Sequence, residues 1–249
     1  MAGSFTADTP AAEAAAAAIP TAAVFYFDLG SPEAYLVAER LAHVLGTAVE
    51  WQPVLARELQ GERRSGGDLD RDLDPRHEPN LDREPNLDRE PDPQRLDAAE
   101  IELRAARRGL MPIRWPAEFP FDSEHAMLAA TYAKSIGRGV PFAQAAFRQA
   151  FAGGRSLAEP DNVLIAAAAC EMHPAAVLRG AELRSVHESL STATAQAARL
   201  GVSRVPAVRI GSTHPGGLTR VFLGEHALEQ ASESWAQTSR ARVAGVENR

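Results

Sequence analysis

The stretch Val24–Leu36, VFYFDLGSPEAYL, changes from a strand pattern to a helix pattern within three residues. Its first part is a continuous apolar and aromatic run, which is typical of a buried strand. The run breaks at Gly30, and Ser31 and Pro32 open a segment whose apolar residues recur at helical spacing. Proline suits the first position of a helix, where a missing N–H costs nothing. The stretch therefore predicts a strand that delivers a serine to the start of a helix.

The residues that follow complete a strand-helix-strand unit. The predicted helix, Pro32–Leu45, has an amphipathic stripe and is closed by Gly46. TAVEWQPVL, residues 47–55, predicts a second strand that ends near Pro53. Because the helix forms the crossover between the two strands, we expect the strands to lie parallel.

The C-terminal part of the chain predicts a helix, two more strands and a last helix. SRVPAVRIG (203–211) and LTRVFLG (218–224) alternate like strands and are joined by a glycine-rich turn. A helix through SLSTATAQAARLG (189–201) precedes them, and EHALEQASESWAQ (225–237) predicts the final helix. Between the two halves, residues 95–190 consist of helical segments separated by Gly or Pro.

This order of elements predicts an α/β fold of the thioredoxin-like type with a large all-helical insertion. Residues 23–59 and 191–236 would form the two halves of the thioredoxin-like domain, and residues 95–190 the insertion. The predicted tails, residues 1–22 and 237–249, lie outside these parts.

Residues 62–94 contain a literal repeat, EPNLDR at 78–83 and again at 84–89. Prolines every six residues prevent a continuous helix, and the few leucines bury too little area to offset the entropy of ordering. Between residues 62 and 100 there are 13 acidic residues against 7 arginines, so most of the net charge of −7 lies in this part of the chain. We predict a disordered acidic loop.

The composition excludes several classes of function. There is no basic patch for nucleic acid, no His/Cys cluster for a metal and no stretch long enough to cross a membrane. The N-terminus lacks the basic region of a signal peptide, so we expect a cytoplasmic protein. A small-molecule substrate is the expected partner, and the alanine-rich insertion offers surfaces for a homodimer. The only cysteine, Cys170, predicts a buried small side chain.

Two interpretations of Ser31 stay open at this point. Serine is a good N-cap residue and needs no catalytic role at the start of a helix. A hydroxyl at this place also faces the positive end of the helix, where it can help to stabilise a thiolate that a ligand brings. The two roles can coexist.

Pro206 interrupts the strand pattern of RVPAVRI, where it would remove a hydrogen bond from the ladder. An edge strand is one explanation. The other is a cis Val205–Pro206 peptide bond, which would turn the backbone away from the sheet and expose the N–H and C=O of Val205.

Four segments together resemble the DsbA-like thioredoxin superfamily, and within it the 2-hydroxychromene-2-carboxylate isomerases and kappa-class glutathione transferases. The segments are FYFDLGSPEAYL (25–36), RWPAEFPFDS (114–123), FRQAFAGGRSLAEPDNVL (147–164) and GVSRVPAVRIG with VFLGEHALEQA (201–211 and 221–231). The resemblance implies that glutathione is a cosubstrate and pairs its cysteinyl backbone with Val205 beside Pro206. Ser31 would then donate a hydrogen bond to the glutathione thiolate, which adds reversibly to a conjugated aromatic substrate.

The resemblance also implies that a segment after the last strand binds the γ-glutamyl end of glutathione. Relatives have a small polar residue, Asp and Arg there, whereas this chain has Glu225, His226 and Ala227. Glu225 would meet the ammonium group and His226 the carboxylate. Glu33 places a negative charge beside the expected thiolate, and such a charge raises the pKa of a thiol.

These departures support an alternative, a non-catalytic thioredoxin-fold protein that binds a peptide or partner at the same face. Dithiol redox chemistry is not expected in either case, because the position of Ser31 carries no thiol.

Overall fold

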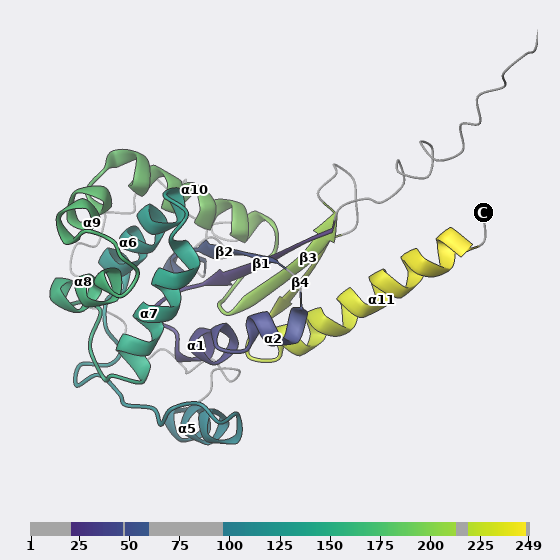
Figure 1. Cartoon of the computed structure of the whole chain (residues 1–249), viewed down its shortest axis with the longest axis horizontal. Helices are drawn as coiled ribbons and strands as arrows, with labels where there is room; N and C mark the ends of the chain where they lie inside the picture. The colour runs from purple at the N-terminus through teal and green to yellow at the C-terminus, as the bar shows by residue number, and fades with distance from the viewer. Residues whose placement is uncertain (1–20, 47, 60–96, 213–218, 248–249) are drawn as a thin grey trace, which may run out of the picture.

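The computed structural model describes residues 21–46, 48–59, 97–212 and 219–247. The strands are β1 (Thr21–Phe27), β2 (Val49–Pro53), β3 (Ala207–Ser212) and β4 (Thr219–Leu223). They form one sheet with the order β2-β1-β3-β4 (Figure 1). β1 runs parallel to β2 and antiparallel to β3, and β4 is antiparallel to β3. This is the mixed four-stranded sheet that the sequence predicted.

Helices surround the sheet and form a block beside one of its ends (Figure 1). The helices are α1 (Pro32–Ala38), α2 (Leu41–Leu45), α3 (Ala56–Leu59), α5 (Ala98–Arg107), α6 (Glu124–Ser135), α7 (Gly139–Phe151), α8 (Pro160–Ala168), α9 (Pro174–Ala181), α10 (Arg184–Arg199) and α11 (Ala227–Glu247). α6 to α9 pack on one another, while α11 packs on β3, β4 and α2. α10 contacts α3 and β2 as well as α6 and α9, so it links the sheet to the helical block.

Strand β1 is buried on both faces, which explains its continuous apolar run. Phe25 and Phe27 belong to a large core cluster that also includes residues of α1, α6, α7 and α11. Val24 and Tyr26 point to the other face and join a smaller cluster with Ala197 of α10. The alternation follows from the two-residue period of a strand.

Aromatic rings join the sheet and α1 to the helical block. The Phe147 ring of α7 has its centroid 5.8 Å from that of Phe27 and 6.2 Å from that of Tyr35. Phe151, one turn further along α7, lies 5.7 Å from Tyr35 by the same measure. The first turns of α1 therefore rest directly on the insertion.

Several boundaries differ from those that the sequence predicted. β1 begins at Thr21, two residues inside the predicted N-terminal tail. The single predicted helix 32–45 is divided into α1 and α2 at Glu39 and Arg40. The rest of the N-terminal tail and the acidic repeat 62–94 lie outside the described residues.

The last two long helices extend beyond their predicted limits. α10 begins at Arg184, so the predicted division between residues 190 and 191 falls inside a helix. Its buried stripe of Val186, Leu190, Thr194 and Ala197 continues without a Gly or Pro to end it. α11 continues to Glu247 instead of ending in a tail at 237, and the added residues include two arginines and two alanines, which favour a helix.

Within the described ranges, no helix has the combination of length and apolar character that crossing a bilayer requires.

Candidate functional site

Ser31 caps the first helix, as the sequence predicted. Its backbone is extended, and its Oγ accepts a hydrogen bond from the backbone N–H of Ala34 at 3.1 Å. Its own N–H donates to the carbonyl of Asp28 at 3.0 Å, which closes the turn between β1 and α1. Ser31 is partly exposed, so the residue that caps α1 also lies at the surface of the protein.

The Ser31 hydroxyl has a second partner that the sequence analysis did not identify. Oγ donates to Oε2 of Glu33 at 3.1 Å, and Glu33 is only 8% exposed. A hydroxyl carries one hydrogen, so this bond uses the whole donor capacity of Ser31. Oγ can donate to a ligand only when it turns away from Glu33.

The Asp28 side chain stabilises the turn between β1 and α1. Its carboxylate accepts from the backbone N–H of Gly30 at 2.8 Å and from that of Ala56 at 2.9 Å. Burial raises the pKa of the Asp28 carboxyl, while hydrogen bonds from Ser123 and from these two backbone groups act in the opposite direction. Asp28 thereby ties the end of β1 to the start of α3.

The second predicted element of the site, Val205 and Pro206, lies at the same end of the sheet. The peptide bond between them is cis, which confirms the prediction made from the strand pattern. Both residues precede β3, whose first residue, Ala207, pairs with Tyr26 of β1. Ser31 follows shortly after the end of β1, and Pro206 directly precedes the start of β3. Because β1 and β3 are antiparallel neighbours, the two residues lie at the same end of the sheet.

A backbone hydrogen bond joins the Pro206 loop to the segment after β4. The N–H of Gly224 donates to the carbonyl of Pro206 at 2.8 Å. Gly224 has a φ of +81°, and a Cβ there would lie 3.0 Å from the Arg204 guanidinium. The positive φ favours glycine at this position, and a Cβ there would make the flexible end of the Arg204 side chain move slightly. The bond brings Glu225 and His226 to the same region as Pro206.

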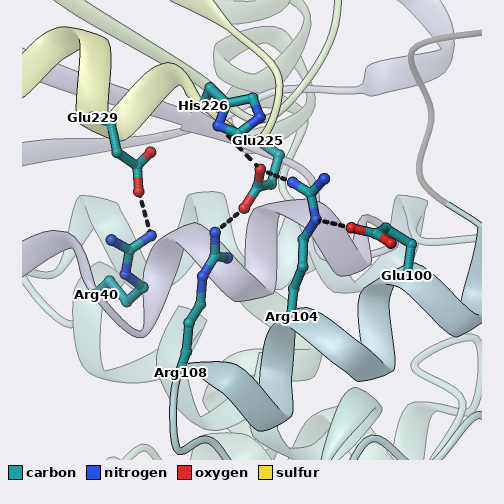
Figure 2. Close-up of polar contacts among 7 residues, drawn as sticks. All are labelled: Arg40, Glu100, Arg104, Arg108, Glu225, His226 and Glu229. Atoms are coloured by element: carbon teal, nitrogen blue, oxygen red, sulfur yellow. Dashed lines mark hydrogen bonds and ion pairs between the residues drawn. The ribbon is translucent and has the colours of Figure 1, made fainter.

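Glu225 is bound by two arginines, one on α5 and one directly after its last residue (Figure 2). Arg104 contacts one carboxylate oxygen and Arg108 the other. The Glu225 side chain is 4% exposed, whereas the neighbouring His226 side chain is 70% exposed. His226 Nδ1 lies 3.4 Å from Glu225. Both oxygens that were predicted to meet an ammonium group therefore already have cationic partners.

The ion pairs around Glu225 continue into a larger network (Figure 2). Arg104 Nε also donates to Glu100 at 2.7 Å, and Arg40 binds Glu229 at 2.6 Å. Burial, followed by repulsion from Arg40, lowers the pKa of Arg108. Figure 2 shows acidic residues at and just before the start of α11 facing one arginine that lies between α1 and α2 and two that lie on or directly after α5. The network fixes α5 against the site.

The arginines of α5 were missed because they lie far from the site in the sequence. The resemblance implies an arginine among the residues that follow the last strand, where this chain has Glu225 and His226. One signal was present, since Glu100, Arg104 and Arg108 recur every four residues and share one face of a helix. That spacing predicts a charged face, but it does not say what the face contacts.

Cys170 is remote from this chemistry and should be unreactive in the folded protein. The side chain is buried, and burial raises the pKa of its thiol, so less thiolate is present at any given pH. We expect alkylation by iodoacetamide at pH 8 to be on the order of 100-fold slower in the native than in the guanidinium-unfolded protein. Mass spectrometry of quenched samples measures this ratio, with Cys170→Ser as the unlabelled control. Equal rates in the two states would contradict the burial.

Comparison with known families decides the classification. A family model described as the DSBA-like thioredoxin domain matches residues 23–234. The chain belongs to this family. None of the curated proteins matches the sequence.

Solved structures share the fold of this DSBA-like chain at low sequence identity. A 2-hydroxychromene-2-carboxylate isomerase is 16% identical, with a TM-score of 0.66 over 89% of this chain and 98% of the other. A probable DsbA oxidoreductase from Streptomyces coelicolor is 14% identical, with a TM-score of 0.59 over 88% and 89%. The cytosolic disulfide reductase DsbM from Pseudomonas aeruginosa with GSH is 13% identical, with a TM-score of 0.54 over 90% and 99%.

Proposed function

We propose that this DSBA-like chain is a glutathione-dependent isomerase or transferase that acts on a conjugated aromatic substrate. The observation that carries the proposal is that Ser31, which is partly exposed, lies at the same end of the sheet as the loop of Val205 and Pro206. Ser31 would hydrogen-bond to the sulfur of glutathione and stabilise the thiolate when the sulfur attacks. The thiolate then adds to the substrate, allows a bond to rotate or a ring to open, and leaves.

The surroundings of Ser31 support binding of a peptide-like thiol. Val205 precedes the ladder of β3, so its backbone can pair with an extended ligand in the manner of an added strand. Arg104 and Arg108 bring two guanidinium groups to the segment after β4, where the carboxylate end of glutathione would lie beside His226. The neighbours that support this include an isomerase and a disulfide reductase with GSH, each similar in fold alone.

Serine at this position favours isomerase or transferase chemistry over disulfide exchange. A dithiol oxidoreductase uses two nearby thiols, and the chain has one cysteine, Cys170, which is buried after α8. A borrowed nucleophile removes the need for a thiol of the protein, because glutathione supplies the sulfur.

Isothermal titration of the full chain with glutathione tests the proposal. We expect a dissociation constant in the range from micromolar to about millimolar, and weaker binding of γ-glutamyl-alanyl-glycine, which lacks the sulfur that Ser31 would contact. The control variant Glu188→Gln removes a negative charge from the surface of α10, where the Glu188 side chain is 60% exposed. It should bind glutathione like the unmodified protein. No heat at millimolar glutathione would reject the proposal.

A second candidate is a non-catalytic protein that binds a peptide or partner at the same face. Two observations favour it: the Ser31 hydroxyl already donates to Glu33, and both oxygens of Glu225 are bound by arginines. This candidate predicts no turnover of 2-hydroxychromene-2-carboxylate or of a conjugated electrophile in the presence of glutathione. Turnover that depends on glutathione would decide against it.

A further inference from the structure

The side chain that competes for the Ser31 hydroxyl is a buried carboxylate on the same helix. Glu33 lies two residues after Ser31, and its Oε2 accepts the only hydrogen of Oγ at 3.1 Å. The opposite side of Oγ accepts from the Ala34 N–H, also at 3.1 Å. One lone pair of Oγ is therefore left for a ligand, and the structure presents Ser31 to a bound sulfur as an acceptor and not as a donor.

We propose that Glu33 sets the direction of the hydrogen bond between Ser31 and a bound thiol, and thereby keeps that thiol protonated until it reacts. The inference rests on the proposed function, because it assigns a role within the same glutathione site. Glu33 acts through Ser31 and has no contact with the ligand sulfur in this scheme, so it is a positioning residue.

The two arrangements of the pair are linked by a balanced proton transfer. In the first, the thiol S–H donates to Oγ, and the Oγ–H donates to the Glu33 carboxylate. When the sulfur attacks, its proton passes to Oγ while the Oγ proton passes to Glu33 Oε2. The second arrangement has a thiolate that accepts from Ser31 and a neutral Glu33 that donates to Oγ. No further acid or base is needed, and departure of the thiolate reverses the transfer.

The hydrogen bond between Ser31 and Glu33 is separate from the ion pairs of the neighbouring elements. α1 packs against α5 and α7, and β1 ends beside it at Asp28, whose oxygens accept from backbone N–H groups. Most charged side chains on the elements around α1 have partners of their own, and Arg107 of α5 is exposed to solvent: the pairs are Arg104 and Arg108 with Glu225, Glu100 with Arg104, Glu102 with Trp115, Arg148 with Glu39, Arg40 with Glu229, and Arg57 with Glu124. Within the described part of the chain, Ser31 is the hydrogen-bond partner of the Glu33 carboxylate.

Neutralising Glu33 should increase the thiolate fraction of bound glutathione. In Glu33→Gln the amide can donate to Oγ, which frees the Ser31 hydrogen for the sulfur, and the nearby negative charge is gone. We expect the midpoint of the thiolate ultraviolet absorbance of the complex to move down by about one pH unit, a tenfold gain in thiolate at a fixed pH below the midpoint. Glu33→Met, which also removes the acceptor and suits a buried position, should shift the midpoint in the same direction.

The matched control is Glu39→Gln. It removes a carboxylate from the end of the same helix, where the side chain is 11% exposed and bound to Arg148, but it leaves the pair of Ser31 and Glu33 intact. Its midpoint should stay near that of the unmodified protein. S-methylglutathione has no thiol proton, so its dissociation constant should be similar for the unmodified protein and the Glu33 variants. This measurement shows whether the variants fold.

The outcomes separate this inference from the function on which it rests. If the unmodified protein does not bind glutathione, both are overturned. If glutathione binds but the Glu33 variants leave the midpoint unchanged or raise it, the role of Glu33 is wrong and the glutathione site stands. A shift of equal size in Glu39→Gln would also overturn the inference, since it would reduce the effect to general charge. Loss of S-methylglutathione binding in both Glu33 variants would make Glu33 a structural residue and reject the proposed role.

Discussion

Replacing Ser31 with alanine should lower glutathione-dependent turnover on the order of 100-fold, the usual effect of removing one hydrogen-bond group that stabilises developing negative charge. Ser31→Ala removes the oxygen that both caps α1 and would contact the sulfur. Steady-state rates with 2-hydroxychromene-2-carboxylate or a conjugated electrophile, at saturating glutathione, measure the loss.

The structural part of that loss can be separated from the chemical part. Removing a serine cap costs about 1 kcal/mol of stability, which leaves the protein folded. His173→Ala is a matched control, because the His173 side chain accepts from the Ala175 N–H at the start of α9 and lies in the helical block. It should cost similar stability without loss of turnover. Full turnover in Ser31→Ala would leave Ser31 only a cap.

Replacing Glu225 with alanine should cost about 3 kcal/mol in the free energy of unfolding, at the lower end of the range for breaking a buried ion pair. The variant leaves Arg104 and Arg108, whose side chains are 21% and 17% exposed, facing each other without the carboxylate between them. Because Arg104 lies on α5 and Arg108 is its C-cap, the loss should loosen that helix from the site. Urea unfolding followed by circular dichroism measures the change.

An exposed ion pair provides the comparison for Glu225. Glu188 binds Arg184 one turn away on α10, with side chains that are 60% and 90% exposed. Glu188→Ala should cost less than about 1 kcal/mol, because water already screens that pair. If Glu225→Ala is no more destabilising than Glu188→Ala, the contacts of Glu225 with α5 contribute little to the fold.

The sequence was sufficient to predict the sheet, because its strands have strong local patterns. The run from residue 23 to residue 27 is apolar or aromatic at every position, and the structure buries both of its faces. Helix limits were harder to predict, since neither Arg184 nor residue 237 is marked by a Gly or Pro. At such places packing decides where a helix begins or ends, and packing is not visible in a local pattern.

The site was predicted where it depends on the backbone and missed where it depends on distant side chains. Ser31 and Pro206 each disturb a local pattern, so the sequence indicated both. The partners of Glu225 come from α5, more than a hundred residues earlier in the chain, and no local feature connects the two. Glu33 was identified as a nearby charge, but its hydrogen bond to Ser31 depends on a rotamer that only the structure defines.

The stacking of α7 against α1 limits how this protein can be re-engineered. The helix that Ser31 caps also carries Tyr35, and the rings of Phe147 and Phe151 cover it. A shortened chain without the helical block would expose Tyr35 and Phe27 to water. It would also remove the side chains on which α1, the helix capped by Ser31, packs. A chimera can therefore exchange this block only for one that offers aromatic side chains at both α7 positions.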